Sequence, residues 1–281
     1  MGALTVAAVI QSRIPAREYF ALPAVSISHL KDLKRSPLHY RHYLTHAKET
    51  PAMVLGTAAH TAILEPERFE REYVVWGKRT ESGRMAPRSG KAWDAFCEEH
   101  AKRTIITEDE YALAMGMRDA VRATPAAMKY LEAGEPEVSM AWDIKGRACK
   151  GRVDWFTPPA LVGLKTARDC RHFTFGAAAA KLGYHLQWAF YHDGYASIRG
   201  EDPAMVEIVV ESAPPHAVAV YRIPNDIIEQ GRAEYEDLLR VLDECEATGE
   251  WPGPCIDEED LTLPSWVYER QEDISDLGLE A

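Results

Sequence analysis

Residues 145–167 constrain the fold of this chain more than any other stretch. They read KGRACKGRVDWFTPPALVGLKTA. Two runs, at 147–156 and 161–166, are typical of short strands, and Pro158 and Pro159 lie in the segment 157–160 between them. Because proline has no N–H to donate to a strand ladder, this segment is expected to be a turn. The sequence therefore predicts a β-hairpin.

The hairpin brings an acid and a lysine onto neighbouring strands. Asp154 lies near the end of the first strand, and Gly163, Leu164 and Lys165 follow one another on the second. Lys165 stands inside the apolar run LVGLKT, where a lysine is rarely found unless it is paired. Asp154 and Lys165 are therefore the strongest candidates for chemistry in this chain.

The remaining elements follow from periodicity and from turn-forming residues. Ser26 or Ser28 is expected to cap a helix that Pro37 interrupts after Ser36. The segment EVSMAWDI at 137–144 alternates as a strand does. We predict further helices at 53–64, 91–102, 108–132 and 175–198, a last helix capped by Asn225 and running to 248, and further strands at 72–76, 206–211 and 217–223. This order predicts an α/β domain with a central mixed sheet flanked by helices.

The net charge of −12 is unusual for a protein that binds nucleic acid, but most of it lies at one end. Nine acidic residues and one arginine lie in 256–281, which contributes −8 of that charge. Residues 77–91, the basic loop, are predicted to form a long exposed segment. The cationic side chains of the basic loop, expected either to contact DNA phosphates or simply to face solvent, are Lys78, Arg79, Arg84, Arg88 and Lys91.

The cysteines and the apolar runs bear on location. The chain has five cysteines, an odd number without a CxxC pair, which is typical of a reduced cytoplasmic protein. Their spacing predicts no iron–sulfur cluster. No apolar run reaches membrane-spanning length, and the first residues lack the basic region of a signal peptide. A cytoplasmic protein without a membrane partner is expected.

Six short motifs follow one another along the chain. They are SerProLeuHisTyr at 36–40, GlyThrAlaAlaHis at 56–60, GluVal at 137–138, GlyArgValAsp at 151–154, GlyLeuLysThr at 163–166 and GlnTrpAlaPheTyr at 187–191. On these motifs the chain resembles, from about residue 28 to 266, the phage and prophage exonucleases of the RecE, or exonuclease VIII, type. These are relatives of lambda exonuclease and of the RecB nuclease domain within the PD-(D/E)xK superfamily.

The resemblance implies one nuclease domain over 1–281, with the restriction-endonuclease-like core of that superfamily. Its parts would be a mainly helical region at 1–135 that carries the basic loop, a catalytic sheet and helix at 136–223, a C-terminal helix at 224–255 and an acidic tail at 256–281.

The resemblance also assigns the centre of the site. Asp154 and the backbone carbonyl of Leu164 would hold Mg²⁺, with Mn²⁺ as a substitute, and Lys165 would orient or help deprotonate the attacking water. His60 and Glu137 would support a second metal ion. Taken alone, His60 on a helix of small residues is more often a packed core histidine, and Glu137 a strand-end carboxylate.

Two residues of the predicted helix 175–198 complete the implied site. Gln187 and Tyr191 are four positions apart and therefore share one helix face. In the family this face lines the active site and contacts DNA or the attacking water. Taken alone, both could be solvated helix positions.

Gly163 departs from the family pattern, which has a second metal-binding acid at this position. Glycine also weakens a strand interior. Either the chain is a naturally damaged or non-catalytic member, or it is an engineered inactive form of an active nuclease. We expect weak metal binding and slow cleavage, and an aspartate at 163 is expected to restore activity.

The implied function is a Mg²⁺-dependent 5′→3′ exonuclease that acts on linear double-stranded DNA ends. It would leave 3′ single strands for a RecT-type annealing protein, in the cytoplasm of a bacterial host and encoded by a phage or prophage. The family forms rings, so a trimeric or tetrameric homo-oligomer is expected. The alternatives are a non-catalytic DNA-binding or assembly protein with a nuclease fold, and a RecB-like nuclease module of a larger complex.

Overall fold

The computed structural model describes residues 9–12, 14–46, 51–255, 257–258 and 260–263, so most of the predicted acidic tail lies outside the described residues. The helices are α1 (Ala16–Ala21), α2 (Ile27–Arg35), α3 (Pro37–Tyr43), α4 (Pro51–Leu64), α5 (Pro66–Glu72), α6 (Lys91–Glu99), α7 (Glu108–Arg122), α8 (Pro125–Leu131), α9 (His172–Lys181), α10 (Tyr184–Arg199) and α11 (Asn225–Thr248). The strands are β1 (Val9–Gln11), β2 (Val25–Ser26), β3 (Tyr73–Trp76), β4 (Thr104–Thr107), β5 (Glu135–Ile144), β6 (Arg147–Thr157), β7 (Ala160–Ala167), β8 (Ala204–Glu211) and β9 (Val218–Arg222). Within these ranges no helix has both the length and the apolar character needed to cross a lipid bilayer.

The expected hairpin is present as β6 and β7, in the middle of the main sheet. The two strands pair antiparallel only next to the turn, from Trp155↔Val162 to Thr157↔Ala160. Away from the turn they separate, and the rest of β6 pairs with β5 and β2. β7 instead pairs along its whole length with β8, in parallel. In the described part of the chain the sheet order is β1-β5-β6-β7-β8-β9, with β2 beside β6, which confirms the mixed sheet.

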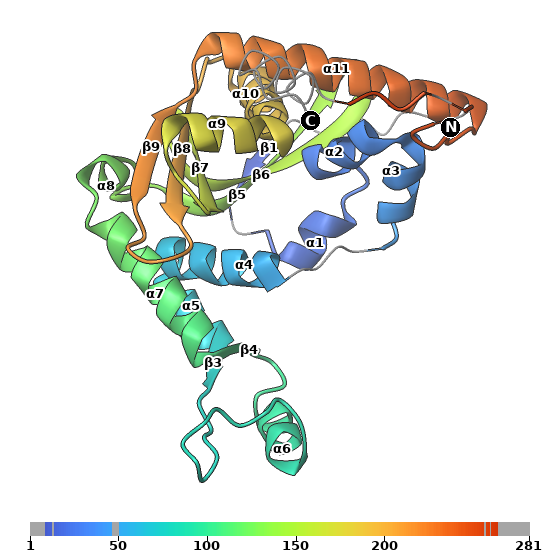
Figure 1. Ribbon diagram of the computed structural model, residues 1–281. Helices are drawn as coiled ribbons and strands as arrows, with labels where there is room; N and C mark the ends of the chain where they lie inside the picture. The colour runs from blue at the N-terminus through green and yellow to red at the C-terminus, as the bar shows by residue number, and fades with distance from the viewer. Residues whose placement is uncertain (1–8, 13, 47–50, 256, 259, 264–281) are drawn as a thin grey trace, which may run out of the picture.

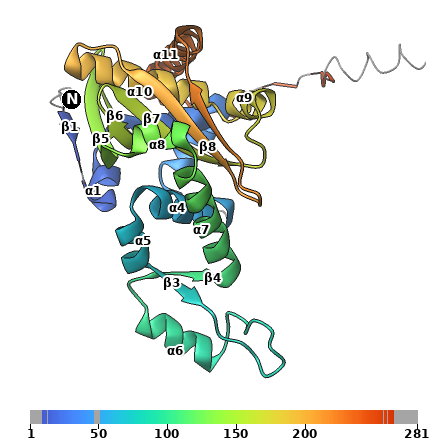
Figure 2. The ribbon, with the colours of Figure 1, turned by 90° about the vertical axis from the view of Figure 1, so that its left-hand side faces the viewer.

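Helices cover both faces of this sheet (Figure 1, Figure 2). α2, α9, α10 and α11 pack on one face, in a core that includes Leu161 and Val209. α4, α7 and α8 pack on the other face, in a core that includes Val162 and Leu164. Successive side chains of β7 therefore alternate between the two cores, as the two-residue period of a strand requires.

Two long helices predicted from the sequence are each divided in two. The helix predicted at 108–132 is α7 followed by α8, because Pro125 cannot continue a helix and starts a new one instead. The helix predicted at 175–198 comprises parts of α9 and α10, which are separated by Gly183 in the left-handed conformation, with φ at +65°. The predicted cap of α11 is also wrong, because Asn225 is the first helical residue and Pro224 is the N-cap.

The N-terminal half is less purely helical than predicted. β1 and β2 join the main sheet, and β3 begins one residue later than expected, at Tyr73. β3 pairs in parallel with β4, a strand that was not predicted, in a separate two-stranded sheet. Trp76 of β3 packs edge-on against Trp93 and Phe96 of α6, which ends at Glu99, three residues earlier than expected. Figures 1 and 2 show that β3, β4, α6 and the basic loop project away from the main sheet.

A partly buried carboxylate joins α10 to α11. Arg232 of α11 donates two hydrogen bonds to Asp193 of α10, at 2.7 and 2.6 Å, and the Tyr235 hydroxyl donates a third at 2.6 Å. Burial raises the pKa of Asp193, but the hydrogen bonds from Arg232, His192 and Tyr235 outweigh burial and hold it well below its usual range. The ionised carboxylate therefore stabilises the packing of α10, the helix that carries Gln187 and Tyr191.

We expect Asp193→Asn to lower the free energy of unfolding by about 2–3 kcal/mol at pH 7, because charge-assisted hydrogen bonds are lost. A carboxyl with a lowered pKa contributes stability above its unfolded pKa, about 3.9, and loses it as the pH falls through its folded pKa. The difference between the two proteins should therefore shrink below about pH 4. Urea denaturation at several pH values measures it. Asp237→Asn, at an exposed ion pair with Arg240, is the control and should cost little.

Candidate functional site

The candidate site lies where β6 and β7 separate. Asp154 stands just before Trp155, which is the first residue of β6, in chain order, that pairs with β7 and the one farthest from the turn. Its Oδ2 accepts a hydrogen bond from the Leu164 backbone N–H at 2.8 Å, so a side chain bridges the two strands where their ladder has ended. Burial raises the pKa of Asp154, but Lys165, His60 and this hydrogen bond outweigh burial and lower it. The carboxylate is therefore held ionised and fixed in position.

Lys165 lies between two carboxylates. Its Nζ is 3.5 Å from Asp154 Oδ2 and 3.4 Å from Glu207 Oε1, and it donates to the Leu164 carbonyl at 3.3 Å. Burial alone would lower the pKa of Lys165, but the charges of Glu207 and Asp154 outweigh it and raise the pKa above its usual value. A charged ammonium group in this position is suited to orienting a water molecule rather than accepting its proton.

Glu207 is a site residue that the sequence analysis missed. It lies in the apolar strand β8, and only 1% of its surface is exposed. Trp188 Nε1 donates to Glu207 Oε2 at 2.5 Å, whereas among the described residues Oε1 has no hydrogen-bond partner beyond its ion-pair contact with Lys165. Burial raises the pKa of Glu207 more than Lys165 lowers it. The signal that could have found it is the one that singled out Lys165, a charged residue inside an apolar run.

The space at Gly163 is not empty. Gly163 and Glu207 are direct partners across the β7–β8 ladder. A methyl group at 163 would lie 2.5 and 2.6 Å from the two carboxylate oxygens of Glu207, which is closer than atoms can approach. An aspartate at 163 therefore requires Glu207 to move. The position that the family's second acid would occupy is therefore filled by a carboxylate from the neighbouring strand.

Glu137 lies opposite Asp154 on β5. The residues on either side of Glu137 pair with the residues on either side of Asp154. The φ of Glu137 is +54°, a conformation that is rare outside glycine and is often found at functional sites. Burial, and then the charge of Asp154, raise the pKa of Glu137 to about 7, while Arg152, 3.6 Å away, acts in the opposite direction. The structure thus brings this predicted residue to the site.

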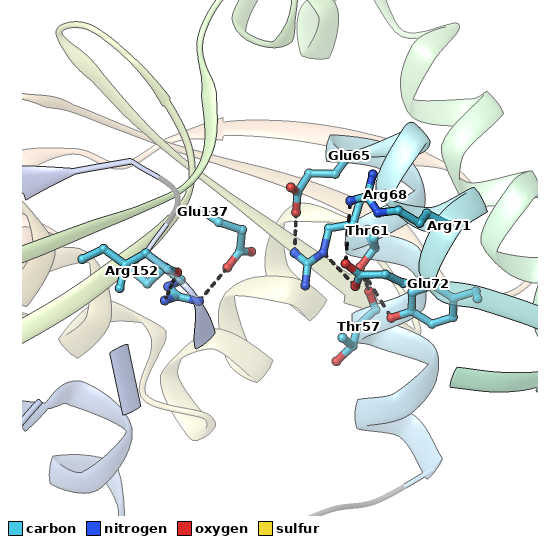
Figure 3. Close-up of polar contacts among 10 residues, drawn as sticks. Thr57, Thr61, Glu65, Arg68, Arg71, Glu72, Glu137 and Arg152 are labelled. Carbon is cyan, nitrogen blue, oxygen red and sulfur yellow. Dashed lines mark hydrogen bonds and ion pairs between the residues drawn. The ribbon is translucent and has the colours of Figure 1, made fainter. Parts of the chain in front are cut away.

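A groove of about 730 Å³ opens beside Glu137. Figure 3 shows Glu137 with Arg152 on one side of this groove and a cluster at the junction of α4 and α5 on the other. In that cluster Arg68 donates to Glu65 at 2.7 Å and to Glu72 at 2.8 Å. The groove is lined by side chains of both charges, and it connects the Glu137 side of the site to the surface.

His60 reaches the site from α4, on the opposite face of the sheet from α10. Burial and the charge of Lys165 lower the pKa of His60, whereas the charge of Asp154 and a hydrogen bond with the Leu164 backbone raise it. Burial is the largest of these effects, and the pKa of His60 is lowered overall. The imidazole is therefore neutral at neutral pH and lies beside the residues it was predicted to accompany. The preceding Ala59 is fully buried, which shows why small residues are needed where α4 meets the sheet.

Gln187 and Tyr191 face the site from α10 and hydrogen-bond to one another. Two neighbours were not predicted. Lys31 of α2 donates to Gln187 Oε1 at 3.3 Å, and the ammonium groups of Lys31 and Lys165 lie 5.0 and 5.4 Å from the centre of the Tyr184 ring. Burial and then Lys165 lower the pKa of Lys31 to about 7.

The basic loop is not brought to this site. Its residues lie on the projecting part of the molecule (Figure 2). Arg79 forms an ion pair with Glu108, and Arg88 forms one with Glu110 at 3.2 Å. Acidic residues of α7 therefore neutralise part of the loop's charge, and contact with DNA phosphates stays a prediction.

The residues present fit a hard divalent cation. A cavity of about 10 Å³, close to the volume that one water molecule needs, lies among Asp154, Gly163, Gln187 and Glu207. The unsatisfied Glu207 Oε1 belongs to a residue that lines this cavity. Among the described residues no three His, Cys, Asp or Glu side chains form a metal-binding group. Mg²⁺ does not need such a group, since it usually keeps several waters and takes only one or two carboxylates.

We expect Lys165→Met to lower the free energy of unfolding by about 3 kcal/mol, because it leaves Asp154 and Glu207 buried without their shared cation. The double variant with Glu207→Gln should lose less unfolding free energy than the sum of the losses in the two single variants, because Lys165 and Glu207 interact directly. Thermal and urea denaturation measure the four proteins of this cycle. Lys181→Met, at an exposed lysine on α9, is the control. Strict additivity would contradict a shared ion pair.

The comparisons with known proteins agree with this geometry. Residues 26–260 match the family described as a PDDEXK-like domain of unknown function. No curated protein is similar enough to the chain to count as a match. One similar solved structure is a candidate exonuclease from Eubacterium rectale, with 14% identity, a TM-score of 0.61, and coverage of 90% of this chain and 96% of that chain. A phage-related exonuclease from Haemophilus somnus 129PT has 9% identity, a TM-score of 0.34, and coverage of 69% of this chain and 95% of that chain.

At 14% identity the first structural similarity establishes the fold alone, and the second is too distant to add to it. The family match covers most of the chain and confirms the expected superfamily, while the narrower RecE-type grouping stays a prediction. The chain therefore belongs to the family of PDDEXK-like domains of unknown function, and it has the nuclease-type fold that this description denotes.

Proposed function

We propose that this protein is a metal-dependent nuclease that hydrolyses phosphodiester bonds in DNA. The observation that carries this proposal is that the mostly buried Lys165 contacts both Asp154 and the Leu164 carbonyl where β6 and β7 separate, beside a small cavity that Asp154 lines. An acid, a carbonyl and a lysine on two diverging strands are suited to hydrolysis of a phosphodiester. They supply oxygen ligands for a cation and a charged donor for the water.

Asp154 and the Leu164 carbonyl would hold Mg²⁺, with Mn²⁺ as a substitute. When bound, the cation supplies positive charge beside the scissile phosphate and acidifies water. Lys165 keeps its proton and fixes the direction of the attacking water through its N–H donors. Gln187 and Tyr191 close the α10 side of the site and restrict where that water can sit.

Glu137 and His60 act from the other two sides. Glu137, with a pKa near 7, can take up or release a proton at the mouth of the groove. The neutral His60 can accept a hydrogen bond from the water or from a phosphate that is protonated in the reaction. A second metal ion near these two residues is part of the proposal and rests on the family resemblance.

The finer features of the proposal rest on the resemblance to RecE-type exonucleases. They are action on linear double-stranded DNA ends, 5′→3′ polarity, assembly into a trimeric or tetrameric ring, and delivery of 3′ single strands to a RecT-type annealing protein in a bacterial host. A ring would be supported by light scattering that gives a closed oligomer at micromolar concentration.

A second candidate function is a DNA-binding protein that does not cut. Gly163 favours it, because the acid expected on β7 is missing from that strand. In this case Asp154 and Lys165 would serve as a structural ion pair. The two candidates differ in a single measurement, cleavage of linear double-stranded DNA with Mg²⁺.

We expect the protein to degrade linear double-stranded DNA with Mg²⁺, and EDTA to abolish cleavage. Asp154→Asn should reduce the rate by about a thousandfold, equivalent to ~4 kcal/mol, because a charged ligand is lost while the shape is kept. A gel assay with end-labelled DNA measures the rate and the polarity together. The control is Asp143→Asn at the far end of β5. If neither protein cuts DNA but both bind it, the non-catalytic function replaces the nuclease.

We also expect the basic loop to contact phosphates. Changing Arg84, Arg88 and Lys91 together to alanine should weaken DNA binding and reduce the slope of log affinity against log salt by up to about three. Arg88 should contribute least of the three, because Glu110 already pairs with it. Fluorescence anisotropy with labelled duplex at several salt concentrations gives the slope.

The control for this experiment changes three exposed cations elsewhere, namely Lys129, Lys181 and Arg240. This triple variant removes the same charge from the chain. An equal loss of slope in both triple variants would show a general charge effect and would return the basic loop to a solvated segment.

A further inference from the structure

We propose that Glu207 is the second metal-binding acid of this site, displaced from β7 to the neighbouring strand β8. The inference rests on the proposed function and deepens it by naming the residue that replaces the acid missing at Gly163. With Glu207 as a ligand, the site of this chain is complete rather than damaged.

The register of β7 and β8 places Glu207 beside Gly163. β7 and β8 run parallel, and Gly163 pairs directly with Glu207 in their ladder. Directly opposed residues on adjacent strands project to the same side of a sheet, about 5 Å apart at Cβ. A glutamate reaches one methylene further than an aspartate. Its carboxylate can therefore occupy the space that an acid on position 163 would fill.

The Glu207 carboxylate occupies the space beside the Gly163 Cα. The Cβ that Gly163 lacks would fall 2.5 and 2.6 Å from the two oxygens of Glu207. The carboxylate thus lies where a side chain at 163 would begin. Glycine at 163 and glutamate at 207 are mutually dependent, because a side chain at 163 would displace the Glu207 carboxylate from the site. The glycine at 163, which departs from the family pattern and suggested a damaged site, is explained by its ladder partner Glu207.

The two oxygens of the Glu207 carboxylate have different surroundings. Trp188 fixes one oxygen at 2.5 Å, and the other, Oε1, is buried without a hydrogen bond among the described residues. That oxygen has only the Lys165 ammonium, 3.4 Å away, and a buried carboxylate oxygen with so little compensation is costly unless a closer cation satisfies it. Glu207 also lines the same small cavity as Asp154. An ion in that cavity would meet two carboxylates from two strands.

A structural ion pair is the plain alternative, in which Glu207 only neutralises Lys165. Asp154 already provides that neutralisation at 3.5 Å. Burying the Glu207 carboxylate as well costs further desolvation energy. Lys165, which is 3.4 Å away and also pairs with Asp154, compensates this cost poorly. Two acids around one lysine leave an excess of negative charge in direct contact, which favours a further cation.

The test measures Mn²⁺ binding without DNA, by the electron paramagnetic resonance signal of free Mn²⁺. Glu207→Gln keeps the shape of the side chain and the Trp188 contact. We expect it to weaken Mn²⁺ binding by about tenfold to 100-fold or more, because mutating even a residue that only supports a metal ligand lowers metal affinity by that range. The matched control is Glu211→Gln on the same strand, where the carboxylate accepts a hydrogen bond from Cys170 N–H. It should bind Mn²⁺ like the unchanged protein.

A relocation variant keeps the test decisive if Glu207→Gln folds poorly. Glu207→Ala should lose Mn²⁺ binding, and adding Gly163→Asp to it should restore binding, because the acid returns to β7 with its space now free. Gly163→Asp alone should not improve binding, since its side chain meets Glu207. Failure of the folded double variant to recover affinity would overturn the proposal.

A third comparison separates a ligand from a partner of Lys165. In the Lys165→Met background, Glu207→Gln should still weaken Mn²⁺ binding. If Glu207→Gln caused no further loss of Mn²⁺ affinity in that background, Glu207 would act only through the lysine. Unchanged Mn²⁺ affinity in the single Glu207→Gln variant would overturn the proposal directly.

The same proteins assayed on DNA distinguish this inference from the proposed function. Cleavage that is equal in the unchanged protein and in Glu207→Gln would leave the nuclease standing and refute the role of Glu207. Mn²⁺ binding that depends on Glu207 without any cleavage would support the metal site and refute the nuclease. An unchanged protein that binds no Mn²⁺ at millimolar concentration would overturn the metal site.

Discussion

The ammonium group of Lys165, buried between the carboxylates of Asp154 and Glu207, is the interaction on which this structure depends. Three charges inside a core are tolerated only if each is satisfied by the surrounding fold. Asp154 gains the Leu164 N–H because β6 and β7 separate at that point, and Glu207 gains the indole N–H of Trp188. The splitting of the hairpin is thus what makes room for charge in the middle of the sheet.

The helices support this centre through their own contacts. α10 supplies Trp188, and it is held on α11 by the Asp193 carboxylate with its three hydrogen bonds from Arg232 and Tyr235. α4 can bring His60 close to the sheet because its neighbouring residues are small, as the fully buried Ala59 shows. The site therefore collects side chains from both faces of the sheet, which no single strand or helix could provide.

Much of the fold could be predicted from the sequence, because the signals were local. Prolines 158 and 159 marked the turn, alternation marked β5, and the order of elements indicated a mixed sheet with helices on both faces. The errors occurred where one residue overrides a periodic pattern. Pro125 and Gly183 each divide an expected helix, and β4 is defined by its parallel pairing with β3, a strand that lies well before it in the sequence.

The site residues likewise fall into those that the sequence predicted and those that only the tertiary structure shows. The sequence by itself determined that Asp154 and Lys165 belong together, since they stand on two strands joined by a short turn, and the motifs brought in His60, Glu137 and Tyr191. Only the tertiary structure decided what fills the space at Gly163. Glu207 is 44 positions further along the chain, and its relation to Gly163 exists only in the parallel register of β7 and β8. Parallel strands are joined by a long crossover, so no local pattern in the sequence specifies which residues become neighbours across them.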